Sequence, residues 1–301
     1  MEEVEKDQAS FRSLKSMTAK DRDASLAAAS IAFLISDWVD AHFSLPDVDI
    51  PPMGSELSAP SEAAMRLRTH WGLGLRPIGN MIDLLEAKGV RVFSLAENSL
   101  RVDAFSCWRG EVPYVFLNTR KSAERSRFDA AHELAHLCLH GRSGARSNTA
   151  EAEADAFAAS FLMPEKDLRA RVLAIRSLKD IIKAKHRWGV SAAAITYRLS
   201  KLNLLSEWHA RKLFIEISRL GYRTDEPEPM ERESSLIWQT VFRELWKDRT
   251  TKDDIAKELH IPQQELESLV FGLASPSFDP RSVLEPGTKF APRLAVDNKN
   301  A

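Results

Sequence analysis

The sequence predicts an α+β fold that is mostly helical and contains one small three-stranded sheet. Apolar residues recur at the helical period of about 3.6 through most of the 301 residues, whereas a period of two appears only within residues 90–117. The chain is 44% hydrophobic and 28% charged, a balance typical of a globular protein with one large core or two smaller ones. This composition excludes fibrous and wholly disordered classes.

Three helices are expected before the sheet, over residues 19–43, 58–72 and 77–88. In the first, apolar residues fall on one helical face, which predicts that this face is buried. Prolines and a glycine separate the first helix from the second, and Gly89 is suited to end the third. The polar residues 1–18 are expected to be frayed.

The predicted sheet consists of strands at residues 90–93, 102–107 and 114–117. A turn around Gly110 joins the last two strands as a hairpin. The segment 113–118 comes directly before the next predicted helix.

The rest of the chain is predicted to be helical, with one interruption. Helices are expected at residues 122–140, 149–162, 165–174, 178–187, 191–202, 206–220, 234–247, 251–258 and 262–270. Residues 224–233 contain two prolines and five acidic residues, which indicates a solvated linker.

These elements predict five parts of the chain. They are an N-terminal helix and linker (1–57), a central domain that contains the sheet (58–175), a helix-turn-helix-like extension (176–222), a C-terminal helical module (223–272) and a disordered tail (273–301).

Charge and cysteine content narrow the class of protein. Lys and Arg number 42 against 43 Asp and Glu, so the chain as a whole is not drawn to nucleic acid or to an acidic membrane. Two cysteines are too few for a disulfide framework. The N-terminus is acidic, and the most apolar stretch, residues 26–35, is shorter than the ~20 residues that span a bilayer. We therefore expect a cytoplasmic protein without a membrane partner.

The chemically distinctive segment is His132-Glu133-Leu134-Ala135-His136 on the predicted helix 122–140. Residues at i and i+4 share a helical face, so the two imidazoles can reach one metal ion. Glu133 adjoins His132 and can act as a general base toward a water molecule at that ion. A surface helix that carries two histidines by chance is the alternative interpretation.

The next helix offers a third ligand. Glu151 and Asp155 are again four residues apart, so Glu151 can bind the metal while Asp155 holds a ligand imidazole through its second nitrogen. Glu153 points roughly 200° away from Glu151 on a helix and is the weaker ligand candidate. Alternatively, Glu151 only caps its helix, because Asn148-x-x-Glu151 fits a capping box.

The strand, the HELAH helix and the following EAEADAFAASFLMP together resemble the ImmA/IrrE family of metallopeptidases, relatives of the gluzincins, over residues 77–205. The resemblance implies a zincin-like fold with a three-stranded sheet packed on the HExxH helix. In such a fold we expect residues 113–118, the strand before that helix, to form a sheet edge on which an extended peptide adds by main-chain hydrogen bonds. It also implies metal ligands at His132, His136 and Glu151, with Glu133 as catalytic base. The implied substrate is a transcriptional repressor of a stress, mobile-element or toxin–antitoxin operon.

Further residues are candidates for binding the oxyanion or the substrate. A metal ion polarises the carbonyl, and a nearby polar side chain often assists it. Tyr114, His140 and Arg127 are the candidates here. His140 lies one helical turn beyond His136, too far along the same helix to be expected as a fourth ligand.

Two segments have the spacing of a helix-turn-helix. Residues 179–201 hold six Lys or Arg against one acidic residue, so DNA contact and a packing unit with a basic surface both stay open. Residues 253–272 lie within the stretch 240–272, which has seven acidic and five basic side chains and therefore favours protein contact over phosphate binding.

The function predicted from these observations is a Zn²⁺-dependent endopeptidase that cleaves a helix-turn-helix repressor, with Mn²⁺ as the other candidate metal. The first alternative is a DNA-binding regulator or antitoxin-like protein with a non-catalytic metal site. The second is a non-catalytic interaction module.

Overall fold

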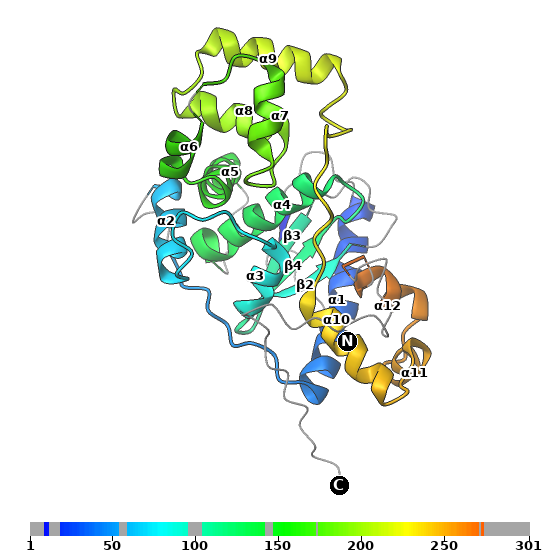
Figure 1. The fold of residues 1–301 in the computed structure, drawn as a ribbon. Coiled ribbons are helices and arrows are strands. Elements are labelled where there is room, and N and C mark those ends of the chain that lie inside the picture. The colour runs from blue at the N-terminus through cyan, green and yellow to red at the C-terminus, as the bar shows by residue number, and fades with distance from the viewer. Residues whose placement is uncertain are drawn as a thin grey trace.

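A computed structural model describes residues 9–11, 19–53, 59–95, 104–141, 147–172, 174–270 and 272–273 of the chain. The described part is an α+β fold, as predicted, in which helices cover both faces of a small sheet (Figure 1). The predicted tail at 273–301 lies almost entirely outside the described residues.

Three helices precede the main strands: α1 (Ala19–His42), α2 (Pro60–His70) and α3 (Met81–Ala87). By length and composition alone, residues 23–42 of α1 could cross a membrane. This apolar stretch is longer than the predicted stretch of residues 26–35. Most of this segment is buried, and Phe33 packs edge-on against Tyr114 of the sheet with ring centroids 4.6 Å apart. Helix α1 therefore contributes to the core.

The sheet has four strands rather than three, because a short strand precedes α1. The strands are β1 (Ala9–Phe11), β2 (Arg91–Ser94), β3 (Ala104–Arg109) and β4 (Val112–Leu117), in the order β1-β3-β4-β2. Strands β3 and β4 form the predicted hairpin, with Gly110 in the turn at φ +57°. Strand β1 pairs antiparallel with β3, although residues 1–18 were expected to be frayed.

Strand β4 is a central strand, so the prediction that segment 113–118 forms an edge is wrong. It pairs antiparallel with β3 on one side and parallel with β2 on the other. The sequence reveals the hairpin partner, because that partner is adjacent in the chain. The parallel partner β2 is brought in by the fold over a longer separation, which local patterns do not encode.

The helix that carries the HELAH segment covers one face of the sheet and contacts β3 and β4 (Figure 1). It consists of α4 (Ala123–Ala135) and, without a break, the π-helix η1 (His136–His140). Ser122 caps its start by accepting a hydrogen bond from the Arg125 amide, and Gly141 follows its end at φ +56°. Helix α5 (Asn148–Leu162) packs across α4 and α2.

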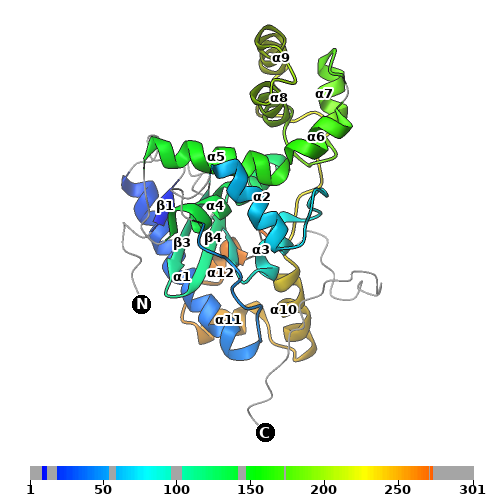
Figure 2. The same cartoon turned by 90° about the vertical axis from the view of Figure 1, so that its left-hand side faces the viewer.

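The predicted helix-turn-helix-like extension lies beyond α5, away from the sheet (Figure 2). The short helix α6 (Glu165–Arg171) leads into it, and the unit itself contains α7 (Leu178–Lys185), α8 (Ala192–Lys201) and α9 (Glu207–Arg219). Serines at positions 177, 191 and 206 precede the three helices, which explains why the helix starts were readable from the sequence.

Residues 223–235 cross from α9 back toward the sheet as an extended strap (Figure 1). The prediction of a solvated linker holds for Asp225, Glu228 and Glu231, which are exposed, but it is wrong for the other two acidic side chains, which lie on buried cations. Glu226 lies 3.5 Å from the ammonium of Lys185, and Glu233 forms a buried ion pair with Arg127. The composition of this segment gives the number of acidic residues but not their partners, because those partners lie tens of residues away in the chain.

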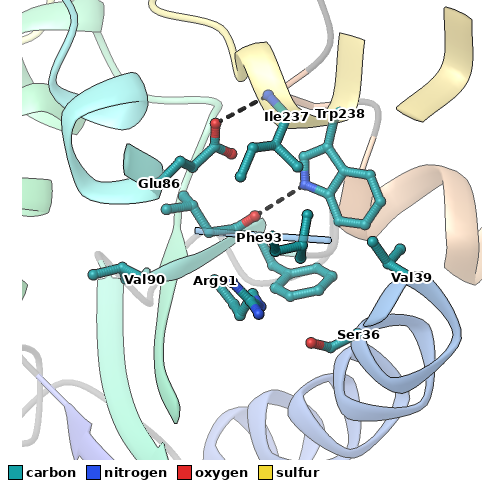
Figure 3. A pocket seen from close by; sticks show the side chains of 10 residues that line it. Ser36, Val39, Glu86, Val90, Arg91, Phe93, Ile237 and Trp238 are labelled. Atoms are coloured by element: carbon teal, nitrogen blue, oxygen red, sulfur yellow. Dashed lines mark hydrogen bonds between the residues drawn. The ribbon is translucent and has the colours of Figure 1, made fainter. Parts of the chain in front are cut away.

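The strap ends at a helical module that packs on the sheet side of the molecule. It contains α10 (Leu236–Lys247), α11 (Lys252–Glu258) and α12 (Gln263–Val270), and α12 contacts α1 and β2. Figure 3 shows how α10 is anchored: Glu86 of α3 accepts a hydrogen bond from the Ile237 amide at 3.2 Å, and the Trp238 indole donates to the Val92 carbonyl at 3.1 Å.

Burial raises the pKa of two carboxyl groups in this anchor. Removal from water raises the pKa of Glu86 to about 8, although hydrogen bonds from Ser235 and Ile237 oppose the shift. Burial also raises the pKa of Asp83, which accepts from the Leu236 amide, to about 6. The N-terminus of α10 is therefore held by two carboxyl groups that gain protons more easily than usual.

Candidate metal centre

The imidazoles of His132 and His136 lie on the buried face of the α4–η1 helix. Their Nε2 atoms are 3.1 Å apart, and the two residues are 1% and 3% exposed. This proximity follows from the i, i+4 spacing, which puts both side chains on one face. Burial excludes the interpretation of a surface helix that carries two histidines by chance.

Helix α5 brings Glu151 to the same point. Its Oε2 lies 3.3 Å from Nε2 of His132, and its Oε1 lies 3.5 Å from Nε2 of His136. One ligand atom from each of the three residues lies within 4.8 Å of the others. Burial alone would raise the pKa of Glu151, but the two histidines outweigh it and lower this pKa to about 2.

Each imidazole is held from behind through its Nδ1 atom. Asp155 lies 2.9 Å from Nδ1 of His132, and Nδ1 of His140 lies 3.0 Å from Nδ1 of His136. A neutral imidazole that donates through Nδ1 has its lone pair on Nε2. When both imidazoles donate through Nδ1, both Nε2 atoms and the Glu151 carboxylate offer electron pairs to one point, which suits a cation.

Glu133 is fully buried between the helix and the sheet. Ser106 of β3 donates a hydrogen bond from its hydroxyl to Oε2 of Glu133 at 2.7 Å. The carboxylate thus sits one residue from a metal-ligand candidate and is fixed by the strand beneath it. Burial, with a smaller contribution from the negative charge of Glu133, raises the pKa of Cys107 to about 12, so this thiol stays protonated.

The residues present fit a metal ion. Two imidazole nitrogens and one carboxylate are the donor set of many three-ligand catalytic zinc sites, and each imidazole has the outer hydrogen bond that such ligands require. The capping-box alternative for Glu151 is wrong, because Ser147 is the residue that caps α5 and Asn148 lies inside the helix.

A comparison with protein families bears on the same residues. Residues 85–200 match the family model Peptidase_M78, the IrrE N-terminal-like domain. This part of the chain belongs to that family. The match covers the HELAH helix, α5 and the first two helices of the extension. The search of curated proteins found no match.

Membership gives the IrrE N-terminal-like domain a metallopeptidase-type assignment, and its group of His132, His136 and Glu151 is able to hold a metal ion. The matched region begins inside α3 and ends inside α8. The domain boundaries predicted at residues 58, 176 and 223 are not tested by this match and stay predictions.

Two of the predicted oxyanion or substrate residues lie away from the centre of the IrrE N-terminal-like domain. Tyr114 pairs with Cys107 across the hairpin, so it faces the side of the sheet opposite to Ser106, where it packs on Phe33. Arg127 is buried at the start of α4 and donates to the Gly79 carbonyl at 3.1 Å, to the Ile78 carbonyl and to Glu233. Both residues hold the fold together.

His140 lies close to the centre but behind it. It contacts His136 through Nδ1, while its Nε2 is 2.9 Å from the Glu153 carboxylate. From the sequence, Glu153 was predicted only as a weak ligand candidate. Its contact with His140 and the hydrogen bond from Ser106 to Glu133 were not predicted. A signal for Ser106 existed, because it is a small polar residue on a buried strand whose side chain alternates with that of Cys107.

A cleft of about 450 Å³ separates α4 and α5 of the IrrE N-terminal-like domain from α8 and α9. Its lining combines charged side chains, among them Asp129 and Arg223, with four aromatic ones: Phe128, Tyr197, Phe214 and Tyr222. Asp155 borders the cleft and also holds His132, so the cleft reaches the residues that support the metal centre.

Proposed function

We propose that this chain is a Zn²⁺-dependent endopeptidase that cleaves a protein substrate in the cytoplasm. The observation that carries the proposal is the convergence of His132, His136 and Glu151 beside the buried carboxylate of Glu133. The family match supports peptidase chemistry. Zinc is favoured because this donor set leaves room for a fourth ligand, as catalytic zinc sites require; Mn²⁺ is the second candidate.

His132, His136 and Glu151 would hold the metal ion, which supplies Lewis acidity to polarise the scissile carbonyl and to acidify a water molecule. Glu133 takes a proton from the attacking water at its carboxylate and gives that proton to the leaving amine. Ser106 keeps Oε2 of Glu133 at a fixed position by its hydrogen bond, so the other carboxylate oxygen points the same way in each cycle.

The substrate peptide is proposed to add to β3 as an extended strand. Ser106 lies on β3, beside the edge strand β1, and contacts Glu133, whereas the opposite edge strand, β2, contacts α12. In the register of the sheet, Ser10 of β1 stands opposite Ser106. An arriving peptide therefore has to replace β1, and the aromatic cleft beside Asp155 is suited to hold apolar side chains of the same substrate.

We propose a helix-turn-helix repressor as the substrate, as the resemblance to the ImmA/IrrE family implies. The test is co-expression of the full chain with the repressor encoded next to its gene. Wild type should cleave the repressor, Glu133→Gln should leave it intact, and Glu165→Gln, on the exposed side of α6, should behave as wild type. Ser10→Pro, which breaks the pairing of β1, should speed the cleavage.

Intact repressor with wild type would contradict the proposed substrate. Equal cleavage by wild type and Glu133→Gln would contradict the proposed role of Glu133, because a glutamine cannot accept the proton from water. Both proteins are compared at equal expression levels and with equal zinc in the medium.

DNA binding through residues 179–201 is the second candidate function, and its charge supports it only in part. Of the six cations, Lys185, Arg187 and Arg198 are engaged or buried within the protein. Lys179, Lys183 and Lys201 stay exposed on the unit. Salt-dependent binding to operator DNA that persists in Glu133→Gln would favour this function over proteolysis.

A non-catalytic interaction module is the third candidate function. Its support, the helix-turn-helix-like segment 253–272, is weakened because α12 uses its buried residues on α1 and β2 of the same chain. Stable capture of the neighbouring repressor without cleavage, by wild type loaded with zinc, would favour this candidate.

A further inference from the structure

We propose that Glu153, acting through His140, sets the tautomer of His136 and thereby keeps Nε2 of His136 available to a metal ion. The inference rests on the proposed metal site, but it does not depend on what the site hydrolyses. Glu153 and His140 are positioning residues in this proposal, because neither is among the three ligand candidates.

The geometry is a chain of three side chains. Nδ1 of His136 is 3.0 Å from Nδ1 of His140, and Nε2 of His140 is 2.9 Å from Oε2 of Glu153. The side chains of His140 and Glu153 are 6% and 27% exposed, so water competes weakly for these hydrogen bonds. Nε2 of His136 faces away from this chain, toward His132 and Glu151.

The positions of the protons follow from the carboxylate at the end of the chain. A carboxylate only accepts hydrogen bonds, so neutral His140 places its proton on Nε2 and presents a lone pair at Nδ1. That lone pair requires a donor, and the nitrogen that faces it is Nδ1 of His136. With its proton on Nδ1, neutral His136 has a lone pair on Nε2, where the metal is expected.

Without the carboxylate, the second arrangement becomes accessible. His140 can then carry its proton on Nδ1, so Nδ1 of His136 becomes the acceptor and the His136 proton moves to Nε2. A proton on Nε2 occupies the position of the metal and has to be displaced before binding. Glu153 therefore favours the metal-binding tautomer of His136 through the intervening side chain of His140.

The backbone supports this arrangement. His136 and His140 are the first and last residues of the π-helix η1, and their ring centroids are 5.0 Å apart. Short π-helical turns within α-helices are frequently found at functional sites. Helix α5 then serves both histidines of the centre: Asp155 contacts His132 directly, and Glu153, on the opposite flank of α5, reaches His136 through His140.

The first test is the Zn²⁺ affinity of the purified full chain, measured by competition with a chromophoric chelator. Glu153→Gln and His140→Ala should each lower the affinity about 10- to 100-fold, which is the usual effect of losing a partner behind a ligand histidine. Glu165→Gln makes the same chemical change at an exposed position of α6 and should leave the affinity unchanged. Circular dichroism verifies that each variant is folded.

A second variant separates position from charge. Glu153→Asp keeps the negative charge but is one methylene shorter, so its carboxylate no longer reaches His140. The proposal expects Glu153→Asp to lose affinity as Glu153→Gln does. Full affinity in Glu153→Asp, with a loss only in Glu153→Gln, would overturn it in favour of a simple effect of charge.

The third readout is the tautomer itself, from nitrogen-15 NMR of the histidines in the metal-free full chain. His136 should be protonated at Nδ1 in wild type and should shift toward the Nε2-protonated form in Glu153→Gln. Equal zinc affinity in wild type and Glu153→Gln, with unchanged histidine signals, would overturn the inference. If wild type itself binds neither Zn²⁺ nor Mn²⁺, the proposed function fails; if wild type binds zinc and the variants bind equally, this inference alone fails.

Discussion

Helix α4 carries a buried charged cluster at each end, and the two clusters differ in how their charges are satisfied. Near its start, Glu124 forms a 2.9 Å ion pair with Lys185, and Glu226 of the strap completes the group at 3.5 Å from the same ammonium. At its end, His132 and His136 meet Glu151. In the first cluster an ammonium group lies between two carboxylates. In the second, two imidazoles and a carboxylate face one another.

This difference separates a structural cluster from a functional one better than burial does. Lys185 lies between Glu124 and Glu226, and the Met230 and Ala192 amides donate to the same two carboxylates, so that cluster finds its cation and its donors within the chain. At the metal centre, the hydrogen bonds of Asp155 and His140 turn both Nε2 lone pairs inward, toward a third acceptor. Such a group is stable only with a cation or an extra proton at its middle.

The largest expected effect comes from removing the cation of the complete cluster. Lys185→Met leaves Glu124 and Glu226 buried without their partner and should lower the free energy of unfolding by about 3–5 kcal/mol, measured by urea denaturation. Lys183→Met, on an exposed position of the same helix, should change it by no more than about 0.5 kcal/mol. A loss below about 1 kcal/mol in Lys185→Met would mean that the cluster is not closed as described.

The open cluster should behave in the opposite way, gaining stability when its cation is added. Zinc at about 100 times its dissociation constant should stabilise wild type by about 2.7 kcal/mol, because it binds the folded state. His136→Ala should lose this gain, whereas His186→Ala, at an exposed position of the extension, should keep it. Thermal unfolding with and without zinc measures both, and equal stabilisation of His136→Ala would argue against this site.

The third prediction concerns pH, and its effect is smaller than the other two only when it is counted per pH unit. The pKa of Glu86 is about 8 in the folded protein against 4.5 for the free group, so the folded state holds a proton that the unfolded state releases. Stability should therefore fall as pH rises from about 4.5 to about 8, by up to about 1.4 kcal/mol per pH unit. Glu86→Gln should remove this slope, and Glu62→Gln, exposed on α2, should not. Parallel pH curves for wild type and Glu86→Gln would contradict the raised pKa.

The parts of the centre that the sequence could predict are those encoded locally. His132, Glu133 and His136 are fixed by the spacing of one helix, and Glu151 with Asp155 repeats that spacing on the next. The helix starts were readable because serine caps are local signals as well.

The features that could not be predicted from the sequence depend on contacts between distant segments of the chain. Glu233 meets Arg127 from 106 residues away, so composition alone made the strap look solvated. Strand β1 is three residues long, too short for a recognisable period, and exists through its pairing with β3. Glu153 was considered only as an alternative to Glu151, and its role depends on how α5 crosses η1.

The most direct test of the account is X-ray absorption spectroscopy of the full chain loaded with zinc, together with the zinc content per chain. The account predicts one zinc ion per chain with two imidazole ligands at about 2.0 Å and a carboxylate oxygen in wild type, and less than one zinc ion per chain in His136→Ala. Failure to bind zinc, or a zinc shell without histidine, would contradict a metal centre built from His132, His136 and Glu151.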